Sequence, residues 1–149
     1  MPMKINAKQH IIDAGLRPTS ARIAVLSVIS CADSALSHSE ILERLVTQKE
    51  FDRVTIYRVL DRLTHHHLVH KISGENRAWK FQISQHTHHA DAHHHAHLLC
   101  TVCGKVSCIP ELSPQFPKPI LKKYHVETID VHFKGLCEDC FSASQPPQN

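Results

Sequence analysis

The sequence predicts an α+β protein of two modules: a helical module that ends in a β-hairpin, then a smaller, strand-rich module that holds most of the cysteines. Apolar residues recur at helical spacing in the first half and alternate with polar residues in the short segments that follow. Charge also divides the 149 residues, because positions 1–83 hold 12 Lys+Arg against 8 Asp+Glu and positions 84–149 hold 5 against 6. Two modules of different chemistry are therefore expected.

Composition excludes several classes of protein. Hydrophobic residues make up 42% of the chain and charged residues 21%, which is typical of a folded domain. No run of 18 apolar residues exists and the first residues lack an apolar signal core, so we expect a cytoplasmic protein with no membrane partner. With 4 glycines the chain has no glycine-rich phosphate loop, and we expect no small organic substrate.

Three or four helices are expected in the first module. Asn6 can cap a first helix that ends at Gly15, and a second helix begins at Pro18-Thr19. Ser37–Glu40 forms a capping box ahead of a third helix. A fourth helix covers about residues 54–65. Its inward-facing apolar stripe consists of Ile56, Val59, Leu60 and Leu63.

Two strands are expected after these helices, at Leu68–Ile72 and Arg77–Ile83, joined by a turn at Ser73–Asn76. The second strand alternates apolar and polar residues, which is typical of a strand with one buried face. Helices followed by a β-hairpin are the elements of a winged helix-turn-helix. The first module is therefore predicted to have this fold.

The fourth helix carries a polar face that could read DNA. Thr55, Arg58 and Arg62 share that face at positions i, i+3 and i+7. The arginines could contact phosphates or guanine edges, and Tyr57 could stack or contact a thymine methyl group. Alternatively, this is a solvated charged face on which Asp61 pairs with Arg58 or Arg62, because a basic face alone is weak evidence of DNA binding.

Two C-x-x-C motifs, at Cys100–Cys103 and Cys137–Cys140, are the strongest signal in the sequence. Each motif supplies two thiolates at the spacing of one edge of a tetrahedron, so together they predict a four-cysteine zinc site. The 33 residues between the motifs require strands that bring them together. Two redox pairs are the alternative interpretation. Since a four-thiolate shell has no open position, we expect structural zinc and no enzyme.

The second module is expected to contain a hairpin over 98–109 and a strand through Ile129, Val131 and Phe133. Seven histidines lie within residues 84–97, which indicates a linker with metal-binding composition. The expected boundaries are 1–83 for the winged-helix domain, 84–97 for the His-rich linker, 98–141 for the metal-binding domain and 142–149 for a disordered tail.

Some histidines and one cysteine have simpler interpretations. His10 and His38 are expected at the surface, and Cys31 is expected to be a small core residue near a helix end. The three consecutive histidines at 65–67 suit the C-terminal end of a helix, where the helix dipole favours cations.

Four segments, taken in order, resemble the ferric-uptake-regulator family of bacterial metal-responsive repressors. They are Ala14–Thr19 with Arg22, Val54–Leu60, His94–Val106 and Gly135–Cys140. The resemblance implies a winged-helix DNA-binding domain, a hinge and an α/β dimerisation domain. It also implies a homodimer that binds a palindromic operator when a regulatory metal is bound. The DNA contacts that it implies are Arg17, Arg22, Thr55, Tyr57, Arg58 and Arg62.

The chain departs from the iron-sensing branch of this family at five positions. Where that branch has two histidines, two glutamates and an aspartate, this chain has other residues, so a standard iron or peroxide site is not expected. These positions hold Ala35, Gln82, Ala96, Cys108 and Ile129.

The zinc-uptake-regulator branch is more similar. That branch has a histidine in the first wing strand, where His70 stands, and another shortly before the first C-x-x-C motif. Its cysteine at the end of the second wing strand falls near Phe81 and is missing, so Cys108 or a linker histidine could replace it. Histidine nitrogens with one thiolate suit Zn²⁺ better than Fe²⁺. The candidate ligands for this second, regulatory divalent metal are His70, His93, His95, His97 and Cys108.

The expected function is therefore zinc-responsive repression of metal-uptake genes. A sensor of iron or another divalent metal in the same family is one alternative. A zinc storage or delivery protein that uses the His-rich linker is another, although storage gives no reason for a DNA-reading helix. An enzyme ranks last, because no glutamate is grouped with three ligands of a catalytic zinc.

Overall fold

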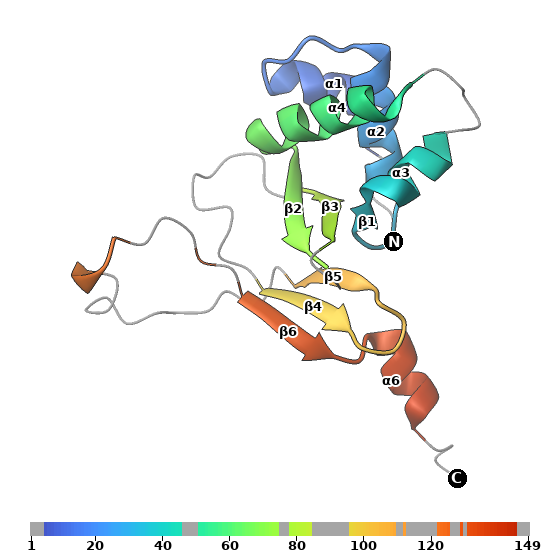
Figure 1. Cartoon of the computed structure of the whole chain (residues 1–149), viewed down its shortest axis with the longest axis vertical. Helices are drawn as coiled ribbons and strands as arrows, with labels where there is room; N and C mark the ends of the chain where they lie inside the picture. Colours follow the sequence, from blue (N-terminus) through green and yellow to red (C-terminus); the bar gives the residue numbers. More distant parts are fainter. Residues whose placement is uncertain are drawn as a thin grey trace. The chain divides into compact units, whose positions relative to one another are not determined.

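The computed structural model describes residues 5–45, 51–74, 78–84, 96–109, 112, 122–125, 129 and 131–145 (Figure 1). The chain divides into two compact units: unit 1, Met1–Thr87, and unit 2, His88–Asn149. Across the described ranges, no helix combines the length and the apolar character needed to cross a membrane.

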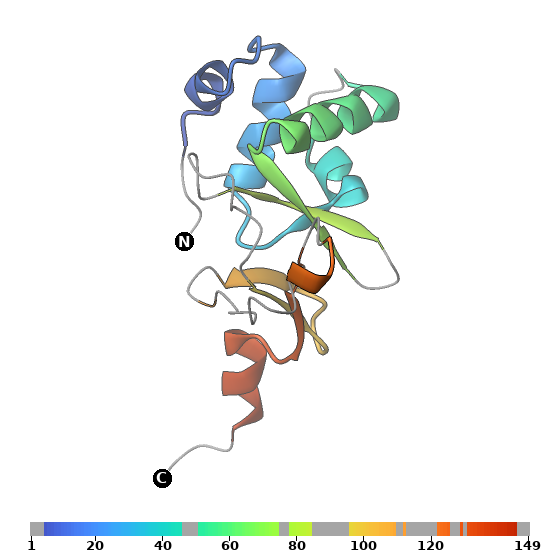
Figure 2. The ribbon, with the colours of Figure 1, turned by 90° about the vertical axis from the view of Figure 1, so that its left-hand side faces the viewer.

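In its described residues, unit 1 contains four helices and a three-stranded antiparallel sheet. These elements are α1 (Ala7–Asp13), α2 (Ser20–Ser30), β1 (Leu36–Ser37), α3 (His38–Leu45), α4 (Arg53–His65), β2 (Val69–Ser73) and β3 (Trp79–Ile83). The strand order is β1-β3-β2. The helices gather on one side of the sheet (Figure 1 and Figure 2). The predicted helices followed by a hairpin are confirmed, and β1 is an element that sequence reasoning missed.

Local capping interactions fix where the helices of unit 1 begin. The side-chain oxygens of Asn6, Thr19 and Asp52 each accept a hydrogen bond from the backbone N–H three residues later, at 3.2, 3.4 and 2.7 Å. The predicted capping box also forms. The Ser37 N–H donates to Glu40 Oε2 at 2.6 Å, and the Glu40 N–H donates to Ser37 Oγ at 3.2 Å.

The apolar stripe of α4 is the centre of the core of unit 1. All four predicted stripe residues are buried, with none more than 7% exposed. They belong to one cluster with Ile11 of α1, Leu26 of α2 and Ile41 of α3. Because burial of each such side chain stabilises the fold by about 1.5–3 kcal/mol, the stripe fixes the rotation of α4 about its axis. The polar face of α4 is therefore held toward solvent.

In its described residues, unit 2 contains a three-stranded sheet followed by the helix α6. These elements are β4 (Ala96–Cys100), β5 (Val106–Ile109), β6 (Val131–Gly135) and α6 (Glu138–Ser144). The central strand β4 is antiparallel to β5 and parallel to β6. Since β4 and β6 run in the same direction, they end at the same edge of the sheet, with Cys100 opposite Gly135.

Three predictions about single residues or boundaries are wrong. Cys31 is exposed and is the C-cap residue of α2, so it is not in the core. His38 is buried, with 9% of its surface exposed, because its ring stacks on Tyr57. The helix α6 continues to Ser144, into the segment 142–149 that was expected to be disordered, and two acidic residues in its first turn suit the positive end of the helix dipole.

Candidate metal centre and nucleic-acid interface

The four cysteines of the two C-x-x-C motifs meet at one edge of the unit 2 sheet. Cys100 is the last residue of β4, and Cys103 lies in the turn that leads to β5. Cys137 is the N-cap residue of α6, and Cys140 lies in the first turn of that helix. The parallel pairing of β4 with β6 therefore brings together two motifs that are 33 residues apart in sequence.

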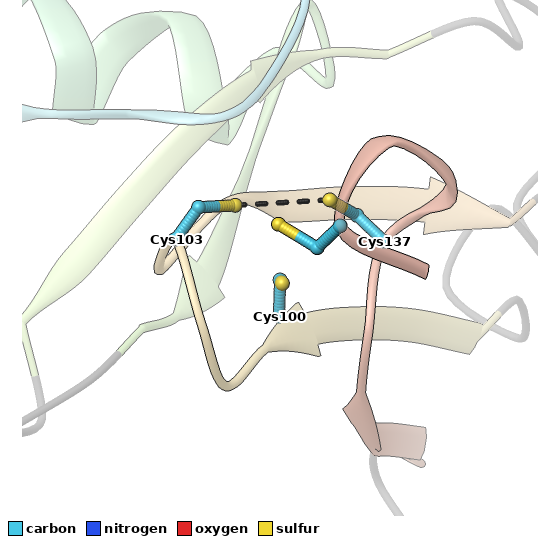
Figure 3. A group of neighbouring side chains, drawn as sticks. Cys100, Cys103 and Cys137 are labelled. Atoms are coloured by element: carbon cyan, nitrogen blue, oxygen red, sulfur yellow. Dashed lines mark hydrogen bonds between the residues drawn. The ribbon is translucent and has the colours of Figure 1, made fainter. Parts of the chain in front are cut away.

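The spacing of the sulfur atoms fits a tetrahedral zinc ion. The Sγ atoms of Cys103 and Cys137 are 3.7 Å apart, and Figure 3 shows them pointing toward each other beside Cys100. All four Sγ atoms lie within 4.8 Å of one another. Two thiolates at the usual Zn–S distance in a tetrahedral shell would be about 3.8 Å apart. The donor set therefore fits structural zinc with no open position.

Backbone hydrogen bonds shape the first motif and tie it to β6. Gly104 has a φ of +70°, a conformation that favours glycine, and its N–H donates to the Cys100 carbonyl at 3.0 Å. The Cys100 N–H donates to the Lys105 carbonyl at 2.9 Å. The Thr101 N–H donates to the Gly135 carbonyl at 2.8 Å. The turn that carries the first two thiols is thus fixed against the strand that precedes the second two.

Cys100 and Cys140 hold their protons unequally. Hydrogen bonds from the backbone N–H groups of Cys103 and Cys137 lower the pKa of Cys100 to about 6. A hydrogen bond with the Cys137 thiol, together with desolvation, raises the pKa of Cys140 to about 12. Cys100 is therefore the more acidic of these two thiols. A bound zinc ion would replace the remaining protons and hold all four sulfurs as thiolates.

Basic residues gather in a groove between α2 and α4. The groove has a volume of about 470 Å³, and its cationic lining residues are Arg22, Arg58 and Arg62. Thr55 lines the same groove, as the sequence spacing predicted. Asp61 also lines it, but among the described residues Asp61 forms no ion pair with Arg58 or Arg62. Neither α4 arginine forms an ion pair among the described residues, although the carboxylate of Asp52 lies close enough to attract Arg58.

Arg17 lies outside the residues that line this groove but is connected to it. Arg17 is exposed in the segment between α1 and α2, and its carbonyl accepts a hydrogen bond of 2.7 Å from the guanidinium of Arg22. Because the backbone of Arg17 accepts this bond, its side chain remains in solvent while the guanidinium of Arg22 is oriented. Both arginines are thus placed as cations at the N-terminal end of α2.

Tyr57 borders a second concavity of unit 1, which has a volume of about 340 Å³ and is also lined by His38 and Trp79. The rings of His38 and Tyr57 stack, with centroids 3.6 Å apart and planes 11° apart, and Tyr57 remains 53% exposed. Burial lowers the pKa of His38 below its ordinary value, an effect that a backbone hydrogen bond with Arg53 partly opposes. A neutral imidazole therefore holds the tyrosine ring in place at pH 7.

The candidate regulatory ligands fall in both units. His70 lies in β2 of unit 1 and is buried, with 7% of its surface exposed. In unit 2, His97 of β4 is the direct cross-strand partner of Cys108 in β5. His93 and His95 lie outside the described residues.

A winged-helix unit with a basic groove, followed by a unit with a four-thiolate metal site, defines a metal-binding DNA-binding regulator. The model of the ferric uptake regulator family matches residues 13–136 of this chain. The chain therefore belongs to the ferric uptake regulator family, whose members are metal-responsive transcription regulators and not enzymes.

Relatives named for iron and for zinc are both similar to this chain. The ferric uptake regulation protein of Legionella pneumophila is 29% identical over 137 residues, which cover 89% of this chain and 96% of that protein. The crystal structure of the Vibrio cholerae ferric uptake regulator matches with a TM-score of 0.61 and 26% identity, covering 87% of this chain and 98% of that one. A zinc uptake regulator complexed with zinc and DNA shares the fold, with a TM-score of 0.68 and 21% identity, covering 92% and 91%.

Proposed function

We propose that this chain is a zinc-responsive repressor of metal-uptake genes that binds a palindromic operator as a homodimer. The basic groove carries the proposal, because Arg58 and Arg62 are exposed there while the opposite face of α4 is buried in the core. Contacts from such side chains to phosphates position a protein on duplex DNA, and contacts to base edges specify the sequence. The proposed contacts are Arg17, Arg22, Thr55, Tyr57, Arg58 and Arg62.

In this proposal the two parts of the chain have separate roles. Residues 1–83 form the DNA-binding domain. The linker, expected over 84–97, ends before β4 begins at Ala96, and the dimerisation and metal-binding domain, expected over 98–141, extends from β4 to the end of α6 at Ser144. The four cysteines hold structural zinc, which stabilises the second domain because the ligands are not assembled in the unfolded chain.

A second zinc ion regulates DNA binding in this proposal. His70 of the winged-helix domain binds it together with His97 and Cys108 of the second domain, and His93 or His95 could contribute. A ligand set of imidazoles and one thiolate supports zinc over Fe²⁺, which accepts more oxygen ligands. Ligands drawn from two domains would restrict how the domains are arranged, and metal binding would thereby favour the arrangement that fits DNA.

The edge strand β6 supports a homodimer. It pairs with β4 on one side within the described sheet, and Phe133 of β6 is 42% exposed. An unpaired strand edge with an exposed aromatic side chain is a template for pairing with a second copy of the chain. In a dimer the two recognition helices would contact successive major-groove faces, ~34 Å apart or a multiple of that distance.

The proposal can be tested by DNA binding at controlled metal concentrations. Operator sites are first selected from random duplex DNA with zinc-loaded protein, and binding to them is then titrated at buffered free Zn²⁺, Fe²⁺, Mn²⁺ and Ni²⁺. We expect Zn²⁺ to induce binding at the lowest free concentration, while the content of structural zinc stays constant. A lower midpoint for Fe²⁺ or Mn²⁺ would contradict zinc sensing. Zinc uptake with no selected DNA would contradict the repressor and favour storage.

A further inference from the structure

A row of three metal-binding side chains crosses the unit 2 sheet. His97 of the central strand β4 is the cross-strand partner of Cys108 in β5 and of His132 in β6. Residues directly opposite one another on neighbouring strands project from the same face of a sheet. Cys108, His97 and His132 therefore lie side by side on one face, on strands that are adjacent in Figure 1.

His97, at the centre of the row, is close to both of its neighbours. The rings of His97 and His132 have centroids 5.7 Å apart and planes 29° apart. A nitrogen of His97 lies within 4.8 Å of the Cys108 Sγ. Two imidazoles on one tetrahedral zinc ion would have centroids about 5 Å apart, and a nitrogen and a sulfur donor would be about 3.6 Å apart. The donor atoms of the three residues are not all within 4.8 Å of one another, so the His132 side chain must rotate toward His97 and Cys108 for one ion to bind all three.

The row is distinct from the four-cysteine site. Successive residues of a strand project from opposite faces, so His97 and Cys100 lie on opposite faces of β4. The two outer residues of the row are more exposed than the central one. His97 is 8% exposed, Cys108 is half-buried and His132 is exposed. An ion could therefore enter from the side of His132. Three protein ligands would leave one position of a tetrahedral shell open.

We propose that His132 is a ligand of the regulatory metal, together with His97 and Cys108. One thiolate and two imidazoles form a set suited to Zn²⁺ and unsuited to ions that prefer oxygen. This inference rests on the proposed function, in which His97 and Cys108 bind the regulatory metal. It adds a ligand that lies outside the linker, and it places three of the ligands on one rigid sheet. Metal affinity then resides in unit 2, and a fourth ligand from unit 1 couples metal binding to DNA binding.

Cobalt titration of the full-length chain tests this site. With zinc retained in the four-cysteine site, Co²⁺ bound by Cys108 gives a thiolate-to-metal charge-transfer band, and Cys108→Ser defines the background. Histidines of the linker give no such band, because residues 84–96 contain no cysteine. His125→Ala, which removes an exposed histidine of unit 2 outside the sheet, is the matched control for His132→Ala.

We expect His132→Ala to weaken the Cys108-dependent binding of Co²⁺ by at least the ~10-fold that even loss of an outer-shell partner costs. His125→Ala should bind as the wild type does, and His132→Cys should restore affinity with a more intense charge-transfer band. Because His132 is exposed, all variants should retain their structural zinc and their circular dichroism spectrum.

Wild-type affinity and spectrum in His132→Ala would overturn the inference and leave zinc-dependent repression intact. Absence of a Cys108-dependent band in the wild type would overturn it as well. If His132→Ala weakens Co²⁺ binding but zinc has no effect on DNA binding of the wild-type chain, the metal site stands and the proposed function fails.

Discussion

Arg58 lies on the exposed face of α4, in the same groove as Arg62, and its helix is held by the buried stripe on the opposite side. We predict that Arg58→Ala weakens operator binding without changing the zinc content. Loss of a base contact would weaken binding by ~1–3 kcal/mol and relax specificity at one operator position. Loss of a phosphate contact would instead reduce, by about one, the slope of log affinity against log salt concentration. Fluorescence anisotropy with a labelled operator at several salt concentrations measures both effects.

The matched control for this prediction is Arg44→Ala, which removes an exposed cation of α3 that does not line the groove. An equal loss of affinity in the two variants would indicate a general effect of charge. Unchanged affinity in Arg58→Ala at every salt concentration would remove Arg58 from the interface.

The His38–Tyr57 stack makes the stability of unit 1 depend on pH. Burial lowers the pKa of His38 below 6.5, so the folded state binds this proton more weakly than the unfolded chain does. The stability that the neutral ring contributes is therefore complete above about pH 6.5 and is lost as the pH falls below it. We predict that the wild type loses more stability between pH 7 and pH 5.5 than His38→Phe, which keeps an aromatic ring but cannot titrate.

Urea unfolding followed by the fluorescence of Trp79 measures this difference, because Trp79 is the single tryptophan of the chain and lies in unit 1. Any loss of structural zinc in acid affects both proteins equally and cancels in the comparison. Parallel pH profiles for the two proteins would show that His38 titrates as it does in the unfolded chain.

At the level of secondary structure elements, the helices could be predicted because their signals are local. Asn6 caps α1 and Ser37 caps α3 through backbone groups three residues away, so neighbouring residues in the sequence suffice. The two-residue strand β1 could not be predicted, because it exists through pairing of Leu36 with Phe81 in a distant strand. Such a pairing depends on the packing of the whole unit.

Leu60 of α4 lies in the core and is 1% exposed. Its truncation should therefore lower the free energy of unfolding. Leu60→Ala should destabilise unit 1 by about 2–5 kcal/mol, because the substitution removes buried methyl groups and leaves a cavity. Val54→Ala on the same helix is the control, since Val54 is 57% exposed and its truncation should change stability by about 0.5 kcal/mol or less. Urea unfolding monitored by Trp79 fluorescence compares them. Equal stability of the two variants would contradict the packing of α4.

The ends of β4 and β6 are joined by the four-cysteine site, so loss of one thiol should affect all of unit 2. We predict that Cys137→Ser releases the structural zinc and lowers the melting temperature of unit 2, because zinc binding contributes to folding. Zinc content after dialysis and calorimetry test this. Cys31→Ser, at an exposed cysteine outside the cluster, should retain one zinc per chain. A Cys137→Ser variant that retains tightly bound zinc and its melting temperature would show that the site is misassigned.

Of the sites in the whole molecule, the four-cysteine site is the one whose residues the sequence predicted most completely. The spacing within each C-x-x-C motif is a local signature of a metal ligand pair, and only the parallel pairing of β4 with β6 was needed to join the motifs. The place of His132 beside His97 could not be predicted, because it depends on the register of two strands that are far apart in the sequence. The stack of His38 on Tyr57 likewise joins two helices and has no local pattern.

Metal can change the affinity for DNA only if its ligands come from both domains, whereas metal binding alone needs ligands from only one. A ligand set confined to one domain binds its ion equally well in every domain arrangement, so it cannot change the affinity for DNA. If His70 of the winged-helix domain completes the set, the bound metal favours one arrangement. Operator DNA must then raise the metal affinity by the same factor, and coupling of ~1–3 kcal/mol, or about 5–150-fold, is typical.

We therefore predict different defects for two variants, one that removes a proposed ligand of unit 2 and one that removes the proposed ligand of unit 1. Cys108→Ser should lose both the regulatory metal and the zinc dependence of operator binding. His70→Ala should still bind metal through unit 2 but should lose the effect of zinc on DNA affinity, and operator DNA should no longer raise its metal affinity.

His10→Ala, at a partly exposed histidine of α1, is the control and should respond as the wild type does. Operator binding titrated against free Zn²⁺, with the structural zinc measured in parallel, distinguishes these outcomes. If both variants respond at the free zinc concentration of the wild type, the sensor lies elsewhere, and the next candidates are the linker histidines His86, His88, His89 and His93.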